Sequence, residues 1–360
     1  MADVLRIGGE PPVTLQAFKA PAEGPAFVEA TVLPGRGMML LQARLRLPSA
    51  EVADALFAPA PARAARELDG GPDDFAGDKS FSFGGAILAP YANRIRGRAV
   101  EGAREIETEV AGRSVRLPRN WGGKATGAEQ YAMHGLILDA PVTDWRMERA
   151  DRLAGRLAAG DFGGRWPGRA NLTFGWSLDA GSLRLRVEAQ NIGDAPLPMG
   201  IGWHPYFALP SGNRRQARLW VPARSRVLVN DYDEVLPTGA LEAVAGGAYD
   251  FSGAGGRALG DQYLDDCFTD LRRQDGQAVV ELHDPAAGLG LRMASASPQV
   301  SAFQIYAPPD KAFVVVEPQF NLADPYGAQW RGRDTGMALV PAGGSVVYEV
   351  RVTAFALGNR

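Results

Sequence analysis

Strict alternation of apolar and polar residues recurs along this chain, and it constrains the fold more than any other feature. Residues 41–47 (LQARLRL), 183–189 (LRLRVEA) and 346–353 (VVYEVRVT) each place apolar side chains at every second position. A period of two is the geometry of a strand with one buried face. Helical periodicity is scarce by comparison. The pattern predicts an all-β protein built as an antiparallel sandwich.

Turn residues and one irregular segment complete this organisation. The chain contains 44 Gly and 26 Pro in 360 residues, as expected for many strands joined by tight turns. Residues 52–68 have a helical composition, but Pro59 and Pro61 interrupt them and the polar run DGGPDDFAGDKS follows. We therefore expect one domain over residues 1–360, with a short helical turn and a surface insertion at about 52–80.

Charge and cysteine content exclude several classes of partner. The formal net charge is −3, with 38 basic and 41 acidic residues and no long run of either sign, so neither nucleic acid nor an anionic membrane is expected as a partner. The sequence has no apolar stretch of membrane-spanning length and no secretory pattern at its start, which predicts a cytoplasmic protein. Cys267 is the single cysteine, so an internal disulfide is excluded.

The stretch AFVVVEPQ, residues 312–319, carries an acid where none is expected. Its valines are typical of a strand buried on both faces, yet the run leads into Glu317 and Pro318. An ionised group inside a protein is costly without a partner, and proline cannot donate to a strand ladder. We expect Glu317 to lie at a strand end and to face a cleft.

Two of the three histidines have unusual neighbours. His134 precedes Gly135 and an apolar segment, while His204 lies in the aromatic run WHPYF. Either histidine could be an ordinary hydrogen-bonded structural residue. Aromatic rings, however, also offer flat apolar faces on which the C–H side of a sugar ring can lie. A carbohydrate site around His204 is a reasonable hypothesis.

Two further polar clusters fit such a site. Asn93 and Arg94 in LAPYANRIRGR combine an amide with a planar guanidinium, a good multi-donor clamp for neighbouring hydroxyls. Asp265 and Asp266 form an acidic pair in YLDDCFTD. Acidic pairs in loops usually face water, so this second cluster carries little weight alone.

Taken together and in order, these clusters resemble the aldose 1-epimerase (galactose mutarotase) family, in a divergent bacterial branch. The matching pieces are ANRI (92–95), HG (134–135), HPYF (204–207), DDCF (265–268), FQIY (303–306) and VEPQ (316–319). They cover most of the chain. The segment after His134 lacks the second glycine typical of galactose enzymes, which leaves the identity of the sugar open.

The resemblance implies a fold and a reaction. The fold would be a large antiparallel β supersandwich, and the reaction would interconvert the α and β anomers of a free hexose without cofactor or metal. By motif, Glu317 matches the general base and His204 the general acid. The positions that hold the sugar are matched by Asn93, Arg94, His134, Asp265 and Gln304. The choice of Asp265 over Asp266 follows its spacing from Phe268.

Other functions fit some of the same residues. A carbohydrate sensor would use the pocket without turnover, and a glycoside hydrolase would need two acids at the scissile bond. His134, His204 and a carboxylate could also form a metal site. Arg96, Arg98 and Arg165 could form an anion pocket for a phosphorylated or sulfonated sugar. The sequence does not indicate an oligomeric state.

Overall fold

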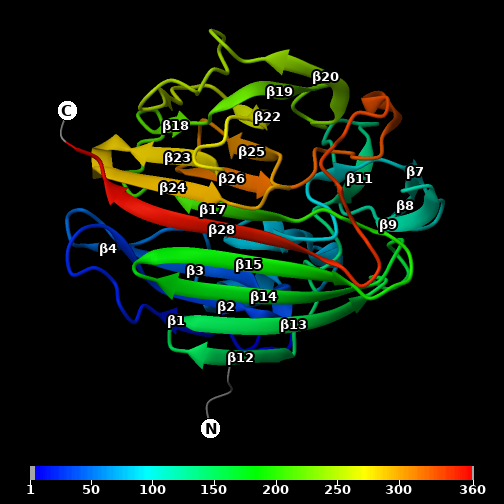
Figure 1. Ribbon diagram of the computed structural model, residues 1–360, viewed down its shortest axis with the longest axis horizontal. Helices are drawn as coiled ribbons and strands as arrows, with labels where there is room; N and C mark the ends of the chain where they lie inside the picture. Colours follow the sequence, from blue (N-terminus) through cyan, green and yellow to red (C-terminus); the bar gives the residue numbers. More distant parts are fainter. Residues whose placement is uncertain (1–4, 359–360) are drawn as a thin grey trace.

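The alternating segments form long antiparallel strands in two large sheets (Figure 1). The computed structural model describes residues 5–358. The eleven-stranded sheet contains, in spatial order, β1 (Val13–Gln16), β2 (Ala26–Leu33), β3 (Met39–Arg46), β5 (Gly85–Leu88), β17 (Gly202–Ala208), β26 (Phe313–Gln319), β25 (Ala302–Ala307), β22 (Leu264–Leu271), β19 (Ala223–Val229) and β20 (Pro237–Ala243), with β4 (Val52–Asp54) beside β3.

The second large sheet has nine strands. Its order is β12 (Asp144–Arg149), β13 (Arg152–Gly160), β14 (Ala170–Asp179), β15 (Ser182–Asn191), β28 (Ser345–Ala356), β24 (Leu289–Ser295), β23 (Ala278–Asp284), β18 (Arg218–Trp220) and β21 (Arg257–Ala258). One buried apolar cluster joins the two sheets, with Val314 and Val316 from the first and Phe174 and Val350 from the second. The core therefore lies between the large sheets, as in a sandwich.

Short elements surround this sandwich. Three small sheets are formed by β10 (Trp121–Gly122), β11 (Gln130–Met133) and β6 (Arg94–Ile95); by β7 (Arg98–Ala99), β8 (Glu105–Val110) and β9 (Arg113–Pro118); and by β16 (Leu197–Met199) and β27 (Ala338–Val340). The helices are α1 (Pro61–Glu67) and the 3₁₀ turns η1 (Pro34–Arg36), η2 (Phe75–Phe81), η3 (Pro285–Ala287) and η4 (Ala328–Trp330).

The predicted strands and their buried faces are confirmed. Residues 41–47, 183–189 and 346–353 fall almost wholly within β3, β15 and β28, and the apolar position of each alternating pair is the buried one. The all-β antiparallel class follows directly from this agreement. No helix within residues 5–358 is long and apolar enough to cross a membrane.

Strand β26 explains the run AFVVVEPQ. Val314 and Val316 point into the core between the sheets, whereas Phe313 and Val315 belong to a separate apolar cluster with Tyr206. Both faces of the strand are thus covered, which requires a continuous apolar run. The predicted strand end at Glu317 is wrong, because β26 continues through Pro318 to Gln319. Proline has a φ compatible with an extended strand and removes only one donor.

The segment at about 52–80 is held to the body by buried contacts. It contains β4, α1 and most of η2, so a short helix does form within the expected range. Arg36 donates to Asp74 at 2.9 Å, and both side chains are buried. Arg36 also donates to Ser80, which in turn donates to the carbonyl of Leu138. That the segment is an insertion in a single domain stays a prediction.

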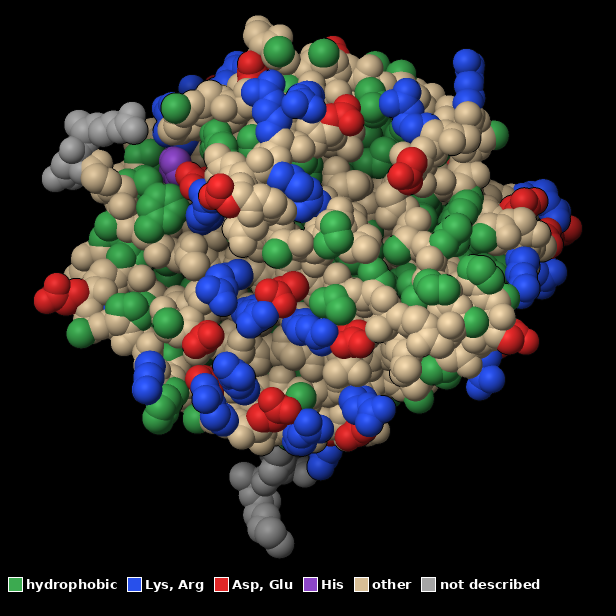
Figure 2. Space-filling model, viewed as in Figure 1, with side chains coloured by type: hydrophobic (Ala, Val, Ile, Leu, Met, Phe, Trp, Pro, Cys, Tyr) green, Lys and Arg blue, Asp and Glu red, His purple; other side chains and the backbone are tan. Residues whose placement is uncertain are grey.

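Charges of both signs are interspersed on the outer face of the nine-stranded sheet (Figure 2). Neighbouring strands pair Arg184 with Glu349 at 2.6 Å, while Arg186 contacts Glu188 at 2.9 Å on the same strand. Mixed signs on this face leave no extended basic stripe of the kind that tracks a nucleic-acid backbone.

Candidate active site

A cavity of about 430 Å³ opens on the face of the eleven-stranded sheet that is turned away from the core. All seven side chains singled out from the sequence line it: Asn93, Arg94, His134, His204, Asp265, Gln304 and Glu317. Residues more than 200 positions apart therefore converge on one pocket.

Strand register sets the floor of this cavity. Gln304 of β25 is the direct cross-strand partner of Glu317 of β26. On the other side of β26, the pairs that flank His204 in β17 place that histidine opposite Glu317. Side chains in one cross-strand row share a face and lie about 5 Å apart. The acid, the amide and the imidazole are neighbours because three adjacent strands carry them in one row.

Asn93 and His134 enter the cavity from the small sheet that contains β6 and β11. Asn93 precedes β6 and His134 follows β11, and these strands pair through Arg94 and Met133. Both residues have left-handed backbone conformations, with φ of 62° and 63°. Asparagine tolerates this region better than most residues, whereas histidine there is uncommon. These special conformations aim both side chains at the sheet face.

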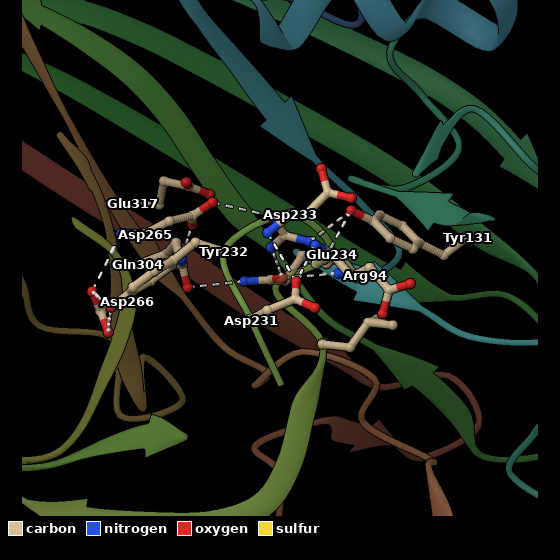
Figure 3. Close-up of polar contacts among 12 residues, drawn as sticks. Arg94, Tyr131, Asp231, Tyr232, Asp233, Glu234, Asp265, Asp266, Gln304 and Glu317 are labelled. Atoms are coloured by element: carbon tan, nitrogen blue, oxygen red, sulfur yellow. Dashed lines mark hydrogen bonds and ion pairs between the residues drawn. The ribbon is translucent and has the colours of Figure 1, made fainter. Parts of the chain in front are cut away.

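A buried polar network joins four of these residues, Asn93, Arg94, Asp265 and Gln304, and Figure 3 shows Arg94, Asp265 and Gln304 within it. Arg94 donates from Nη1 to Asn93 Oδ1 at 2.9 Å and lies 3.4 Å from Asp265 Oδ2. Gln304 donates from Nε2 to Asp265 Oδ1 at 2.5 Å, and its own Oε1 accepts from Asn93 Nδ2 at 3.1 Å. Arg94 also donates from Nε to the hydroxyl of Tyr131 at 3.2 Å. Each member fixes the orientation of the next.

Glu317 and His204 form a buried polar pair in the cavity. His204 Nε2 lies 3.3 Å from Glu317 Oε1, and both side chains are buried. Within residues 5–358, Glu317 Oε2 and His204 Nδ1 have no hydrogen-bond partner. Buried polar atoms are normally satisfied, so unsatisfied ones in a cavity mark a ligand site.

Burial shifts the pKa values of this pair toward their neutral forms. It raises the pKa of Glu317 well above its usual range. The negative charge of Asp265 raises this pKa further, and the positive charge of Arg94 lowers it. It lowers the pKa of His204 to about 3, and Arg94 adds to that shift. Desolvation penalises the imidazolium of His204 and the carboxylate of Glu317 alike, so burial favours the neutral form of each group.

The tautomer of His134 bears on the metal hypothesis. His134, His204 and Glu317 each bring one ligand atom within 4.8 Å of the others. However, His134 Nδ1 accepts a hydrogen bond from the backbone N–H of Asn93 at 3.3 Å. Neutral imidazole then carries its proton on Nε2, which makes this nitrogen a donor and not a metal ligand. The arrangement suits a hydroxyl oxygen better than a cation.

Adjacent acids in β22 face different partners. Asp265 binds Arg94 and Gln304 in the cavity, whereas Asp266 accepts from Arg226 at 2.6 Å and from the Tyr232 hydroxyl at 3.0 Å. Neighbouring residues of a strand point to opposite faces. Figure 3 shows Asp265 near Glu317 and Asp266 directed elsewhere.

Several cavity residues were missed by sequence reasoning. Phe57 and Phe81 come from the segment at about 52–80 and its edge, and Phe81 packs edge-on against His134 with ring centroids 4.9 Å apart. Tyr232 and Asp233 come from the loop between β19 and β20. Asp233 accepts from the backbone N–H groups of Lys124 and Ala125. Isolated aromatic residues in loops carry no motif that would have revealed them.

The arginines considered for an anion pocket are engaged elsewhere. Arg96 pairs with Glu129 at 2.7 Å and Arg165 lies 3.4 Å from Glu105, while Arg98 pairs with Glu107. None of the three lines the cavity described above. Carboxylate partners already neutralise each guanidinium, so these arginines do not form an anion pocket at this site.

Comparison with solved structures identifies the fold class as galactose mutarotase-like. A GalM/aldose epimerase homologue from Caenorhabditis elegans has a TM-score of 0.71 at 16% identity, covering 96% of this chain and 99% of that one. A galactose mutarotase-like protein from Clostridium acetobutylicum has a TM-score of 0.69 at 15% identity, covering 92% and 94%. A galactose 1-epimerase from Lactobacillus acidophilus has a TM-score of 0.64 at 18% identity, covering 96% and 99%.

The family follows from the sequence itself. The family model described as aldose 1-epimerase matches residues 63–333, and the chain belongs to this family. A search of curated proteins found no match. The family resemblance and the supersandwich fold expected from the ordered motifs are confirmed.

Proposed function

We propose that this protein is an aldose 1-epimerase that interconverts the α and β anomers of a free hexose. The observation that supports it most is the buried pair of His204 Nε2 and Glu317 Oε1, 3.3 Å apart at the floor of a polar cavity. The two oxygens of a hemiacetal that must exchange protons are bonded to the same carbon. The general base that acts on the anomeric hydroxyl and the general acid that acts on the ring oxygen must therefore also lie close together.

The reaction conserves the protons of this pair. Glu317 takes the proton of the anomeric hydroxyl while His204 gives a proton to the ring oxygen, and the bond from the anomeric carbon to the ring oxygen breaks. Rotation about the C1–C2 bond of the open aldehyde exposes its other face. Both transfers then reverse as the ring closes, which restores imidazolium and carboxylate.

The electrostatics of the cavity suit this exchange. The open-chain stage leaves neutral His204 and protonated Glu317, which are the forms that burial favours. The closed-ring stage needs one proton moved across the 3.3 Å between them. A pair that holds the same total charge in both stages avoids the cost of burying an extra ion.

The remaining polar residues would hold the sugar. His134 Nε2 is a donor without a partner in the described residues, and Arg94 and Gln304 hold Asp265 in place as an acceptor. Such a ring of donors and acceptors matches vicinal hydroxyls. Each correctly placed acid or base typically contributes about 10²- to 10⁴-fold to a rate.

One observation counts against the glycoside hydrolase alternative. Asp265 is the second buried carboxylate in the cavity, but its contacts with Gln304 and Arg94 hold it as a hydrogen-bond acceptor and not as a proton donor or nucleophile. A hydrolase needs a second acid free to donate or to attack. A carbohydrate sensor is disfavoured for a different reason, since simple binding does not require an acid beside a base.

Freshly dissolved α-anomers provide the test. We expect the protein to accelerate the change in optical rotation of α-D-glucose or α-D-galactose, with both anomers visible by NMR. An aryl glycoside and its free sugar should be offered in parallel. Release of the aryl group without faster anomerisation would indicate a hydrolase, and binding without either reaction would indicate a sensor.

A further inference from the structure

A buried asparagine binds the backbone immediately before Asn93. Asn321 accepts from the N–H of Ala92 at 3.0 Å and donates to the carbonyl of Ala92 at 2.9 Å. Its amide also donates to the carbonyl of Leu322 at 2.9 Å, which fixes the amide itself. Ala92 is buried in the irregular segment between β5 and β6, so both of its backbone polar groups need a partner. A carboxamide supplies a donor and an acceptor side by side, as a neighbouring strand would.

A second buried asparagine binds the backbone immediately before His134. Asn120 accepts from the N–H of Met133 at 2.8 Å and donates to the carbonyl of Met133 at 3.1 Å. Asn120 is buried in the link between β9 and β10. The backbone of the preceding residue turns away from Met133, because the N–H of Arg119 donates to the carbonyl of Arg104 at 2.9 Å. The side chain of Asn120 therefore takes the place of strand backbone beside Met133.

Asn120 and Asn321, which we call the amide clamps, fix the peptide planes that set both left-handed conformations. The peptide group that precedes Asn93 is bonded at its oxygen to Asn321 and at its N–H to His134 Nδ1. The peptide group that precedes His134 is bonded at its oxygen to Asn120 and at its N–H to the carbonyl of Asn93. A peptide group is planar, so hydrogen bonds at opposite ends fix its orientation. Because φ is the rotation relative to that plane, the clamps help to hold φ at 62° and 63°.

A third buried asparagine shows what a purely structural amide looks like in this fold. Asn191 donates to the carbonyls of Ala195 and Val340, each at 2.8 Å, and accepts from the N–H of Gly193 at 2.9 Å. Neither Asn191 nor these partners line the cavity. Its role is to satisfy buried backbone groups at a turn. The amide clamps differ because each is bonded to the peptide group of a residue that lines the cavity.

We propose that Asn120 and Asn321 are positioning residues of the sugar site, an inference that rests on the proposed function and adds two residues to it. Neither residue lines the cavity, so each acts through the backbone by holding Asn93 and His134 in the conformations that aim their side chains inward. Arg94 donates to Asn93 Oδ1, so the Asn321 clamp also steadies the guanidinium. The acid/base pair is held separately, by the strand ladder. The clamps therefore govern sugar binding more than proton transfer.

The first test separates KM from kcat. Asn120→Ala and Asn321→Ala are compared with the wild type, with α-D-glucose and α-D-galactose as substrates. We expect KM, and Kd from calorimetry, to rise about three- to tenfold in each clamp variant, as for the loss of about one well-placed hydrogen bond to the sugar. The value of kcat should stay within threefold. Asn191→Ala is the matched control for a lost buried amide, and it should keep KM, Kd and kcat within twofold even though it also lowers Tm.

The second test needs no sugar. In the wild type, His134 Nδ1 accepts from the N–H of Asn93, which keeps the ring proton on Nε2. Loss of either clamp should weaken that bond and give a mixture of the two neutral tautomers at pH 7, as measured by ¹⁵N NMR of the imidazoles. Asn191→Ala should keep the wild-type tautomer. The chain has three histidines, and His134→Gln identifies the signals that belong to His134.

Failure of this inference and failure of the epimerase function are distinguishable. Wild-type Kd and a single His134 tautomer in folded clamp variants would overturn the positioning role and leave the epimerase function intact. An equal rise of KM in Asn191→Ala would also overturn it, because the effect would then reflect stability alone. Absence of anomerisation by the wild type would overturn the epimerase function, and the His134 tautomer would still decide the role of the clamps. Asn120→Ser or Asn321→Ser, which keeps a hydroxyl near the backbone, replaces an alanine variant that does not fold.

Discussion

Asn93 and His134 hold each other in left-handed backbone conformations through two hydrogen bonds. The N–H of Asn93 donates to His134 Nδ1 at 3.3 Å, and the N–H of His134 donates to the carbonyl of Asn93 at 2.9 Å. With φ of 62° and 63°, both residues occupy a region that costs most residues free energy. The reciprocal bonds offset that cost at a place where both side chains line the cavity.

Substitution of Asn93 separates this backbone effect from the loss of its amide. Asn93→Gly and Asn93→Ala both remove the contacts with Gln304 and Arg94. We expect anomerisation to fall alike in the two variants. The free energy of unfolding should be about 1 kcal/mol lower for alanine than for glycine, because only alanine is strained at positive φ. Urea denaturation measures the difference; equal stabilities would contradict the role given to the backbone.

Glu317→Gln tests the proposed base. The amide keeps the shape of the side chain but cannot accept the proton, so we expect kcat to fall about 10²- to 10⁴-fold. Sugar affinity should remain within about threefold, as measured by calorimetry. Glu51→Gln serves as the control, because Glu51 is exposed and outside the cavity. A Glu317→Gln protein with wild-type kcat would rule out this base.

The pH dependence of kcat/KM should reflect the buried pair. Activity requires one proton on the pair; it fails when both groups are protonated and when neither is. Burial raises the pKa of Glu317, so the first proton binds there, and it lowers the pKa of His204 to about 3, so the second binds only in strong acid. Activity should therefore persist below the ordinary histidine pKa of about 6.5.

The measurement is the initial rate of anomerisation across pH 3.5 to 8, corrected for the spontaneous reaction at each pH. We expect the acid limb to have its midpoint below about pH 5. A midpoint near the ordinary histidine value of about 6.5 would show that the imidazole titrates as in water, and the proposed pair would need revision.

Asp265 and Asp266 form a matched pair for substitution. Asp265→Asn removes the charge opposite Arg94 and leaves an acceptor for Gln304, so we expect KM to rise about tenfold. Asp266→Asn weakens the contact with Arg226, which does not line the cavity, while the amide oxygen can still accept from the Tyr232 hydroxyl. Its KM should stay within twofold, while the free energy of unfolding falls by about 1 to 3 kcal/mol. The reverse pattern would exchange the roles of the two acids.

Much of the fold could be predicted because strand periodicity is local. The alternation in residues 183–189 alone specifies the buried face of β15, and the structure agrees. Glu317 was recognisable for a similar reason, since a carboxylate within an apolar run violates a local rule. Gln304 came only from the ordered motifs, whereas His204 was singled out by its aromatic neighbours. Their positions as cross-strand neighbours of Glu317 could not be read from the sequence, because pairing between distant strands leaves no signal in a single sequence.

Other parts of the site could not be predicted. Phe57 and Tyr232 are aromatic residues in irregular segments, and nothing in their neighbours indicates which surface they join. The lowered pKa of His204 depends on how completely the folded chain excludes water from it. Burial of that kind is a property of the assembled sheets, so composition and spacing did not indicate it.

The cross-strand row formed by His204, Glu317 and Gln304 couples the loss of activity to unfolding. Its spacing is maintained by the ladder between β17, β26 and β25, and not by a loop that could open independently. A slip of one residue in the pairing of β26 would turn Glu317 into the core and bring Val316 or Pro318 to the cavity, so any change of register removes the carboxylate from the site. On heating, chemistry should persist until the central strands separate, and the loss of catalysis and the loss of the fold should be one event.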